Sequence, residues 1–305
     1  MEKKNLIVRI LGNDLCNLHG DSQTIHNLLF TLDNEPLFEN TDKIYVLNRI
    51  LDNEKRNTII DILTKRNIFF FELPFEYNEY KKNVPIIQPN VQNILNKIMG
   101  GKSLHNSERG TISLGLMCHR LYIMNINQAR NWCIDYGKSK GYTWTFVFDS
   151  NAFLTKKMYD DIIHNIQDET EYISIPQIRL HDGKLQNFEI LNSPEKLENL
   201  PYNEHQLAFK NTSKYTFNVN IPYGTMNKGE MLNALGIPGR WEKWKKELDF
   251  LHIEQRKFTN VRFQTLSKVI RLDPGNIHND ISTNWVNRMV GTYKLSQYIQ
   301  SVYGS

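Results

Sequence analysis

The first 74 residues alternate short apolar runs with segments of helical periodicity, and no other feature of the sequence limits the fold as strongly. Residues 6–11, 44–47 and 68–73 are apolar runs of the length and composition of buried strands. Between them, residues 22–32 and 53–65 place apolar side chains on one helical face. Because parallel strands need crossover connections, this order predicts a parallel sheet covered by helices. Such sheets bind ligands beyond the carboxyl ends of their strands.

Length and charge narrow the class of protein further. A chain of 305 residues can bury a hydrophobic core, as one α/β domain or as a domain with an appendage. Hydrophobic residues make up 40% and charged residues 23%, which is typical of a folded chain and unlike a disordered one. The formal net charge of +4 suits anionic substrates but is too small to indicate a nucleic-acid-binding surface. Nucleic acid is therefore not expected as a partner, although it stays open.

Membrane insertion and disulfide bonding are not expected either. A membrane-spanning helix needs roughly 20 apolar residues, and no stretch of the sequence approaches this. The apolar run at residues 6–11 is also too short for a signal peptide. The three cysteines, Cys16, Cys118 and Cys133, show no paired spacing and indicate a reducing compartment. We expect a cytoplasmic protein without a membrane span.

The periodicity weakens between residues 75 and 124. Gly100-Gly101, Gly110 and Gly115 interrupt it, which predicts a long insertion with partly mobile loops. Such a segment is either a lid over a site or an ordered excursion that packs on the domain. Regular elements are expected again after it: a helix at 128–136, a strand at 142–148, a helix at 156–166 and a strand at 171–175.

Chemistry is indicated where the helix at 128–136 meets the following strand. Arg130 and Asn131 lie near the start of the helix, and the strand ends at Asp149, where parallel sheets open onto ligands. The planar guanidinium of an arginine suits phosphate. A carboxylate beside a diphosphate usually needs a divalent cation between the two anions. Alternatively, Asp149 merely caps the next helix and Arg130 is a structural ion-pair partner.

These residues resemble the core of the family 2 glycosyltransferases with the GT-A fold. In that family an Ala-Arg-Asn helix precedes an apolar strand that ends in an Asp-x-Asp type motif, and this chain has Ala129-Arg130-Asn131 and Asp149-Ser150-Asn151. The resemblance implies a GT-A-like α/β fold with a mostly parallel sheet. It also implies a nucleotide-diphosphate sugar donor and a hydroxyl acceptor, which is a glycan, a glycolipid, a protein or a modified nucleic acid.

By position, the resemblance assigns a set of residues that would bind the donor. Four of them lie in or just after the first two strands, and the other four lie in the Ala-Arg-Asn helix and in the Asp-x-Asp type motif. The set consists of Arg9, Asn13, Asn48, Asp52, Arg130, Asn131, Asp149 and Asn151. The resemblance also implies a single domain over residues 1–305. Its parts are a nucleotide-binding core at 1–74 and 125–180, an insertion or lid at 75–124, and an acceptor side at 181–305.

The resemblance and the residue types together suggest candidates for metal binding and catalysis. Asp149 and Asn151 would hold Mn²⁺ or Mg²⁺, with His278 as a later ligand or a structural histidine. An amide binds a cation more weakly than a carboxylate, so Asn151 indicates weak metal binding, a different phosphate arrangement or metal-independent chemistry. Alongside Asp149, Glu204 and Glu242 are candidate catalytic residues, because a general base for a hydroxyl is a carboxylate or a histidine; each is otherwise a surface carboxylate.

Two other functions are compatible with the fold. A sugar-phosphate nucleotidyltransferase would need a glycine-rich first loop with a lysine, and Leu11-Gly12-Asn13-Asp14 lacks both further glycines and the lysine. A non-catalytic module that binds carbohydrate or another partner is favoured by Asn151, which replaces the second acidic residue of the motif.

Overall fold

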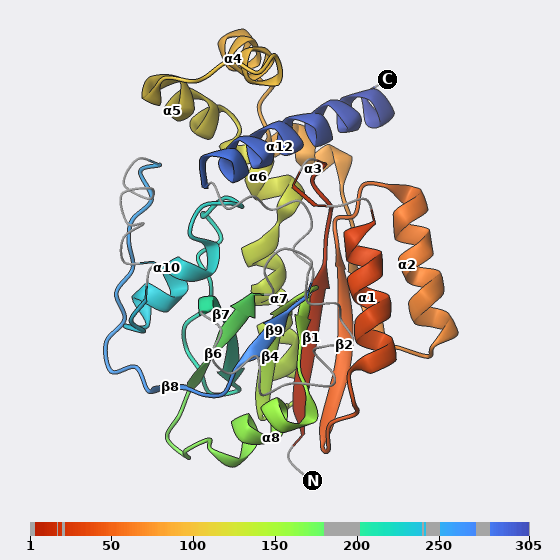
Figure 1. Ribbon diagram of the computed structural model, residues 1–305, viewed down its shortest axis with the longest axis vertical. Coiled ribbons are helices and arrows are strands. Elements are labelled where there is room, and N and C mark those ends of the chain that lie inside the picture. Colours follow the sequence, from red (N-terminus) through yellow and green to blue (C-terminus); the bar gives the residue numbers. More distant parts are fainter. Residues whose placement is uncertain are drawn as a thin grey trace.

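A central sheet with helices on both faces organises the molecule (Figure 1). The computed structural model describes residues 4–16, 18–19, 22–179, 202–239, 241, 251–272 and 281–304. Within these residues nine strands form one sheet in the order β3-β2-β1-β4-β7-β6-β9-β5, with β8 paired to β6.

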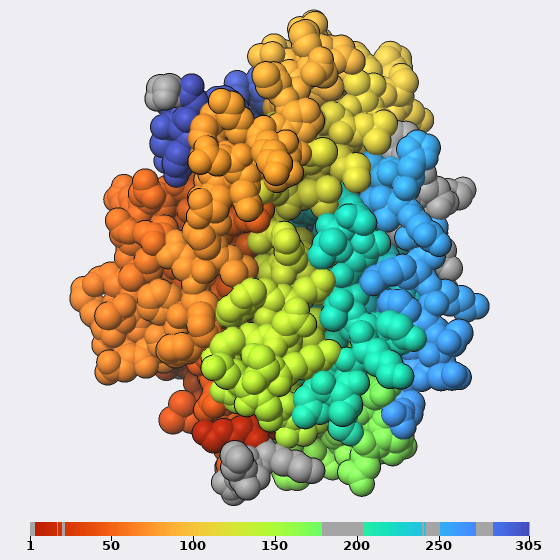
Figure 2. Space-filling model, turned by 180° about the vertical axis from the view of Figure 1, so that it is seen from behind, coloured from red at the N-terminus to blue at the C-terminus, as the bar shows by residue number. Residues whose placement is uncertain are grey.

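The first half of the sheet is parallel, as the sequence predicts. It contains β1 (Asn5–Leu11), β2 (Thr41–Asn48), β3 (Phe70–Leu73) and β4 (Trp144–Asp149). Strand β1 pairs in parallel with both β2 and β4, and β2 pairs in parallel with β3. The crossover helices α1 (Gln23–Asn34) and α2 (Asn53–Lys65) cover one face, and α7 (Ile126–Ser139) covers the other (Figures 1 and 2). Right-handed crossovers require this division, because the chain moves outward from β1 to β3 and then returns to β4.

The second half of the sheet is mixed. Strand β7 (Tyr202–Lys210) runs antiparallel to both β4 and β6 (Tyr172–Arg179). Three short strands, β5 (Ala152–Phe153), β8 (Phe263–Thr265) and β9 (Val269–Arg271), complete the sheet. Helices α8 (Lys156–His164) and α10 (Asn227–Ala234) follow β5 and β7. This mostly parallel sheet flanked by helices confirms the predicted α/β architecture.

The side chains of β1 show how the sequence builds the two faces. Leu6, Val8 and Ile10 pack with α7 in one core cluster, whereas Ile7 belongs to a cluster on the opposite face. All four are at most 4% exposed. Burial of each such side chain stabilises the fold by about 1.5–3 kcal/mol. Because successive side chains of β1 point to opposite faces and are buried on both, this strand lies inside the sheet.

Residues 75–124 are mostly helical, which agrees with the expected ordered excursion and not with a segment made mainly of loops. The segment folds into α3 (Tyr77–Asn83), α4 (Pro89–Met99), α5 (Asn106–Gly115) and α6 (Met117–Met124). With α12 (Ile281–Tyr303) they lie beyond the carboxyl ends of the parallel strands (Figure 1). Glycine here allows close packing instead of breaking helices: a Cβ on Gly115 would meet the Val91 side chain at 2.5 Å. Whether this layer acts as a lid stays a prediction.

No helix in the described part of the chain has the length and apolarity that crossing a membrane requires.

Candidate functional site

Asp149 is the last residue of β4 and lies where the sheet changes from parallel to antiparallel. Since β7 runs antiparallel to β4, the start of β7 reaches the same edge of the sheet. Glu204 and Gln206 come from this part of β7, two residues apart and so on one face of the strand. The side chain of Asp149 is 28% exposed, which leaves part of the carboxylate open to a ligand.

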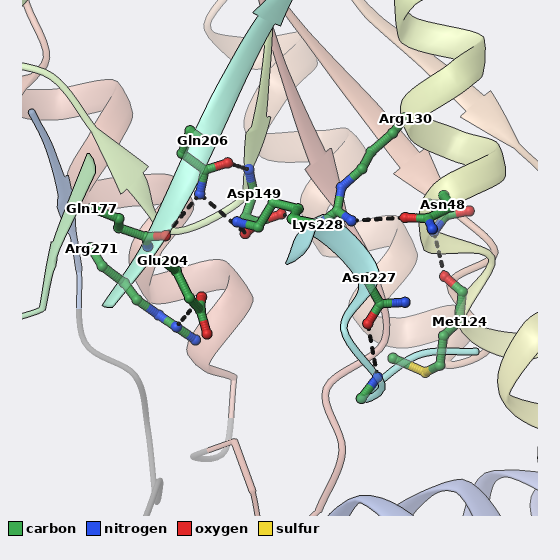
Figure 3. Close-up of polar contacts among 12 residues, drawn as sticks. Asn48, Met124, Arg130, Asp149, Gln177, Glu204, Gln206, Asn227, Lys228 and Arg271 are labelled. Carbon is green, nitrogen blue, oxygen red and sulfur yellow. Dashed lines mark hydrogen bonds and ion pairs between the residues drawn. The ribbon is translucent and has the colours of Figure 1, made fainter. Parts of the chain in front are cut away.

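Two buried cations converge on this carboxylate (Figure 3). Arg130, in the second turn of α7, donates from Nη2 to Asp149 Oδ1 at 2.9 Å. Lys228, in the first turn of α10, donates from Nζ to Asp149 Oδ2 at 2.6 Å. The side chains of Arg130 and Lys228 are only 5% and 10% exposed. Arg130, Lys228 and Asp149 thus form a three-residue charge cluster, in which Arg130 is an ion-pair partner of the aspartate.

Electrostatics in the cluster favour the ionised carboxylate. Burial by itself would raise the pKa of Asp149, but the ammonium of Lys228 and the guanidinium of Arg130 outweigh it and hold this pKa well below its ordinary value of 3.8. For Lys228, burial lowers the pKa below 10.5 and the nearby Asp149 opposes that shift. A lysine in the first turn also faces the positive end of the helix dipole, which disfavours a cation. The cluster therefore concentrates positive charge at the edge of the sheet.

Neutral side chains fix the orientation of these groups. Asn127 Oδ1 accepts from Arg130 Nη1 at 2.9 Å, and its Nδ2 donates to the Asn218 carbonyl at 2.8 Å. Gln206 Nε2 donates to Asp149 Oδ2 and to Gln177 Oε1, both at 3.1 Å. Because Asn127 is anchored to Asn218 and Gln206 is anchored to Gln177, the cluster is preorganised rather than assembled by flexible side chains.

Glu204, a predicted general base, lies near the charge cluster at the same edge of the sheet (Figure 3). Arg271 Nη1 donates to Glu204 Oε2 at 3.2 Å, and the Glu204 side chain is 32% exposed. Glu204 is also close enough to Lys228 to raise the pKa of that lysine. Glu242 and His278, the other candidate base and the candidate metal ligand, lie outside the described residues.

Several residues of the predicted donor-binding set have structural partners instead. Arg9 is fully buried, forms an ion pair with Glu35 and donates from Nε to the Ala152 carbonyl at 2.9 Å, so it offers no surface to a nucleotide. Asn131 holds the backbone of Phe217 through both amide atoms, each at 2.9 Å. These two placements correct the positional assignment, because both side chains are already engaged inside the fold.

The polar residues after the first two strands shape the backbone. Asn13 donates to the Arg49 carbonyl at 2.8 Å and accepts from the Leu51 amide at 2.9 Å. Asn48 is 1% exposed, and its amide donates to the Met124 carbonyl at 2.8 Å. Asp52 caps the start of α2 by accepting from the Lys55 amide at 3.0 Å. Asn13 and Asn48 thus bind the backbone, whereas Asp52 is exposed and its role in donor binding stays a prediction.

The residues around Asp149 do not fit a divalent cation. Both carboxylate oxygens already accept from cations, so Mg²⁺ or Mn²⁺ would meet two positive charges at short range. Asn151, at the second acidic position of the motif, is 9% exposed, and its main-chain carbonyl accepts from the Leu272 amide at 2.8 Å. Among the residues that the structure describes, no group of three or more His, Cys, Asp or Glu side chains is arranged to hold a metal ion.

A pocket of about 230 Å³ opens on the same edge of the sheet, between the end of β2 and the start of α7. Arg49, Asn125, Asn127 and Tyr223 are among its lining residues. Figure 2 shows α7 (yellow-green) beside the cyan chain that contains Tyr223. Asn127 also touches Arg130, so the pocket adjoins the charge cluster.

Sequence reasoning did not find the pocket or Lys228. A usable signal for Lys228 existed: a lysine at the start of a helix contradicts the usual preference for acidic residues there. Residues that break a local rule often belong to functional sites.

No family model matches the chain, and no curated protein sequence matches it. Three solved structures that resemble the chain do so remotely. A 4-diphosphocytidyl-2C-methyl-D-erythritol synthase shares 10% identity at a TM-score of 0.32, over 95% of this chain and 99% of that one. The apo form of mouse xyloside xylosyltransferase 1 shares 9% sequence identity at a TM-score of 0.31, over 87% of this chain and 84% of that one. The mannosyltransferase Ktr4p from S. cerevisiae, in complex with GDP, shares 11% sequence identity at a TM-score of 0.27, over 96% of this chain and 62% of that one. Likenesses this slight carry no argument about the site.

Proposed function

We propose that this protein is a glycosyltransferase that transfers a sugar from a nucleotide-diphosphate donor to a hydroxyl acceptor. The observation that carries the proposal is the pair of buried cations, Arg130 and Lys228, held by Asp149 at the carboxyl end of β4. Two cations and one carboxylate leave a net charge of +1, which an anionic ligand would neutralise. A diphosphate is such a ligand, and the carboxyl edge of the sheet is where α/β folds bind one.

Each group has a role in this proposal. Arg130 and Lys228 bind the diphosphate, and the adjoining pocket takes the nucleoside end of the donor. Glu204 accepts the proton of the acceptor hydroxyl. The hydroxyl oxygen forms a bond to the anomeric carbon while the bond from that carbon to the diphosphate oxygen breaks. The departing nucleoside diphosphate keeps the electron pair, and Lys228 and Arg130 stabilise its charge.

Nucleotide binding tests the proposal directly. We expect UDP, GDP or CDP to bind in calorimetry and the matching sugar nucleotide to be consumed in the presence of an acceptor panel. Lys228→Met should weaken diphosphate binding by about 10- to 100-fold, because a hydrogen bond to a charged group contributes about 1.5–3 kcal/mol. Lys157→Met is the matched control, since Lys157 is 67% exposed on α8 and should not affect binding.

The alternatives predict other outcomes. A clear preference for a nucleoside triphosphate, with release of pyrophosphate, would favour nucleotidyl transfer. Binding of oligosaccharides without any nucleotide would favour a carbohydrate-binding module. Either result would replace the glycosyltransferase proposal.

A further inference from the structure

We infer that Lys228 and Arg130 take the place of a divalent cation, so that the protein binds and uses its diphosphate donor without a metal ion. This inference rests on the proposed function and concerns the same site. It starts from the charge of the cluster, which is already +1 before any ligand binds.

A metal site at Asp149 would need a different arrangement of charges. Divalent cations of this kind are held by several oxygen ligands that supply negative charge. Here Asp149 is a single carboxylate, and Arg130 and Lys228 occupy both of its oxygens at 2.9 and 2.6 Å. Adding a divalent cation would bring the cluster from +1 to +3. Binding a diphosphate would instead offset the positive charge of the cluster.

The donors that remain around Asp149 suit phosphate oxygens. A lysine ammonium has three N–H donors, and Asp149 takes one of those of Lys228. Gln177 Oε1 accepts from Gln206, which also binds Asp149, so Gln177 supports the cluster from inside the fold. The Lys228 ammonium and the Arg130 guanidinium together form an anion site without a metal.

Asp149 has a positioning role in this arrangement. Two cations brought together in a buried site repel each other, and the carboxylate between them holds both in place. A diphosphate that binds beside the cluster meets cations that are already oriented. The same cations then stabilise the charge that develops on the leaving diphosphate.

Metal removal tests the inference on the wild-type protein. The protein is stripped with EDTA, its metal content is measured, and nucleoside diphosphate affinity and sugar-nucleotide turnover are compared with and without added Mn²⁺ or Mg²⁺. We expect the dissociation constant and the turnover to change by less than about threefold, which is under 1 kcal/mol. Binding or turnover that disappears in EDTA and returns with the metal ion overturns the inference but leaves the glycosyltransferase proposal intact.

Variants of Lys228 show whether this lysine binds the diphosphate or only stabilises the fold. In metal-free buffer, Lys228→Met should lose at least about tenfold in diphosphate affinity, and Lys228→Arg should keep most of it. Equal affinity of Lys228→Met and wild type would overturn the inference. If Lys228→Met does not fold, the chelation experiment on the wild type still decides. Failure of every nucleoside diphosphate to bind, with or without metal, contradicts the proposed function itself.

Discussion

One carboxylate, that of Asp149, holds two side chains that are otherwise among the most costly to bury. Arg130 and Lys228 are 95% and 90% covered, and both make their ion pair with this residue. Removing one partner from a buried ion pair is strongly destabilising, because the other charge is left without compensation. The residue that the sequence selects for chemistry is therefore also one on which the local fold depends.

We expect Asp149→Asn to reduce the free energy of unfolding by about 3 kcal/mol, because both buried cations lose their counter-charge. Denaturant unfolding at neutral pH measures the loss. The double variant Asp149→Asn, Lys228→Met carries one unpaired cation fewer and should recover part of it. A single variant as stable as the wild type would show that water already compensates these cations.

The pH dependence of this loss has a definite sign. Since the folded-state pKa of Asp149 lies below its ordinary value of 3.8, its contribution is complete well above that value and is lost as the pH falls toward the folded-state pKa. The difference in stability between wild type and Asp149→Asn should thus be the same at pH 7 and pH 5.

Among the elements, the layer at residues 75–124 was the hardest to predict. Its helices are short, and α4, α5 and α6 pack partly against α12, more than 150 residues later in the chain. Local periodicity cannot reveal a partner so distant. By contrast, the first strands and helices were predictable, because each buries a regular apolar face against its immediate neighbours in sequence.

Helix α7 positions Arg130, and Gly137 sets how closely this helix approaches β4. A Cβ on Gly137 would lie 1.9 Å from Thr145 Oγ1 and 3.0 Å from Thr145 Cβ. Threonine is β-branched and cannot turn aside easily. We expect Gly137→Ala to lower the free energy of unfolding by about 2 kcal/mol, the cost of overpacking exceeding the gain in helix propensity.

The control for this prediction is Gly100→Ala, at the end of α4. There a Cβ would make only ordinary contacts of 3.4 and 3.5 Å with two carbonyl oxygens, and stability should change by less than about 0.5 kcal/mol. Thermal unfolding of the two variants side by side compares the sites. Equal stability of Gly137→Ala and wild type would mean that α7 can move away from β4.

At the scale of the whole molecule, the sequence predicts the parallel half of the sheet and misses much of the site. Arg130 and Asp149 flank a single helix-to-strand connection, so their proximity follows from one crossover. Lys228 reaches Asp149 only because β7 pairs antiparallel with β4 and α10 then folds back over it. That pairing joins residues far apart in the sequence, and no local pattern specifies it.

Buried histidines on separate elements couple the stability of the whole fold to pH. Burial lowers the pKa of His19, His119 and His205 from 6.5 to about 4 in each case. Below pH 6.5 the unfolded chain therefore binds protons that the folded protein does not, and stability falls until about pH 4 is reached. Each histidine contributes a loss of about 1.4 kcal/mol per pH unit within that window.

Three such groups acting together would remove about 4 kcal/mol per pH unit, a large share of the roughly 5–15 kcal/mol that stabilises a typical domain. We expect the free energy of unfolding to be level near pH 7 to 8 and to drop steeply below pH 6. His119→Gln, which keeps a polar side chain between Ser296 and the Pro85 carbonyl, should flatten that drop by about one third. Denaturant unfolding across this range measures both slopes. An unchanged slope in the variant would show that the pKa of His119 is not lowered in the folded protein, because a histidine with the same pKa in both states contributes no slope.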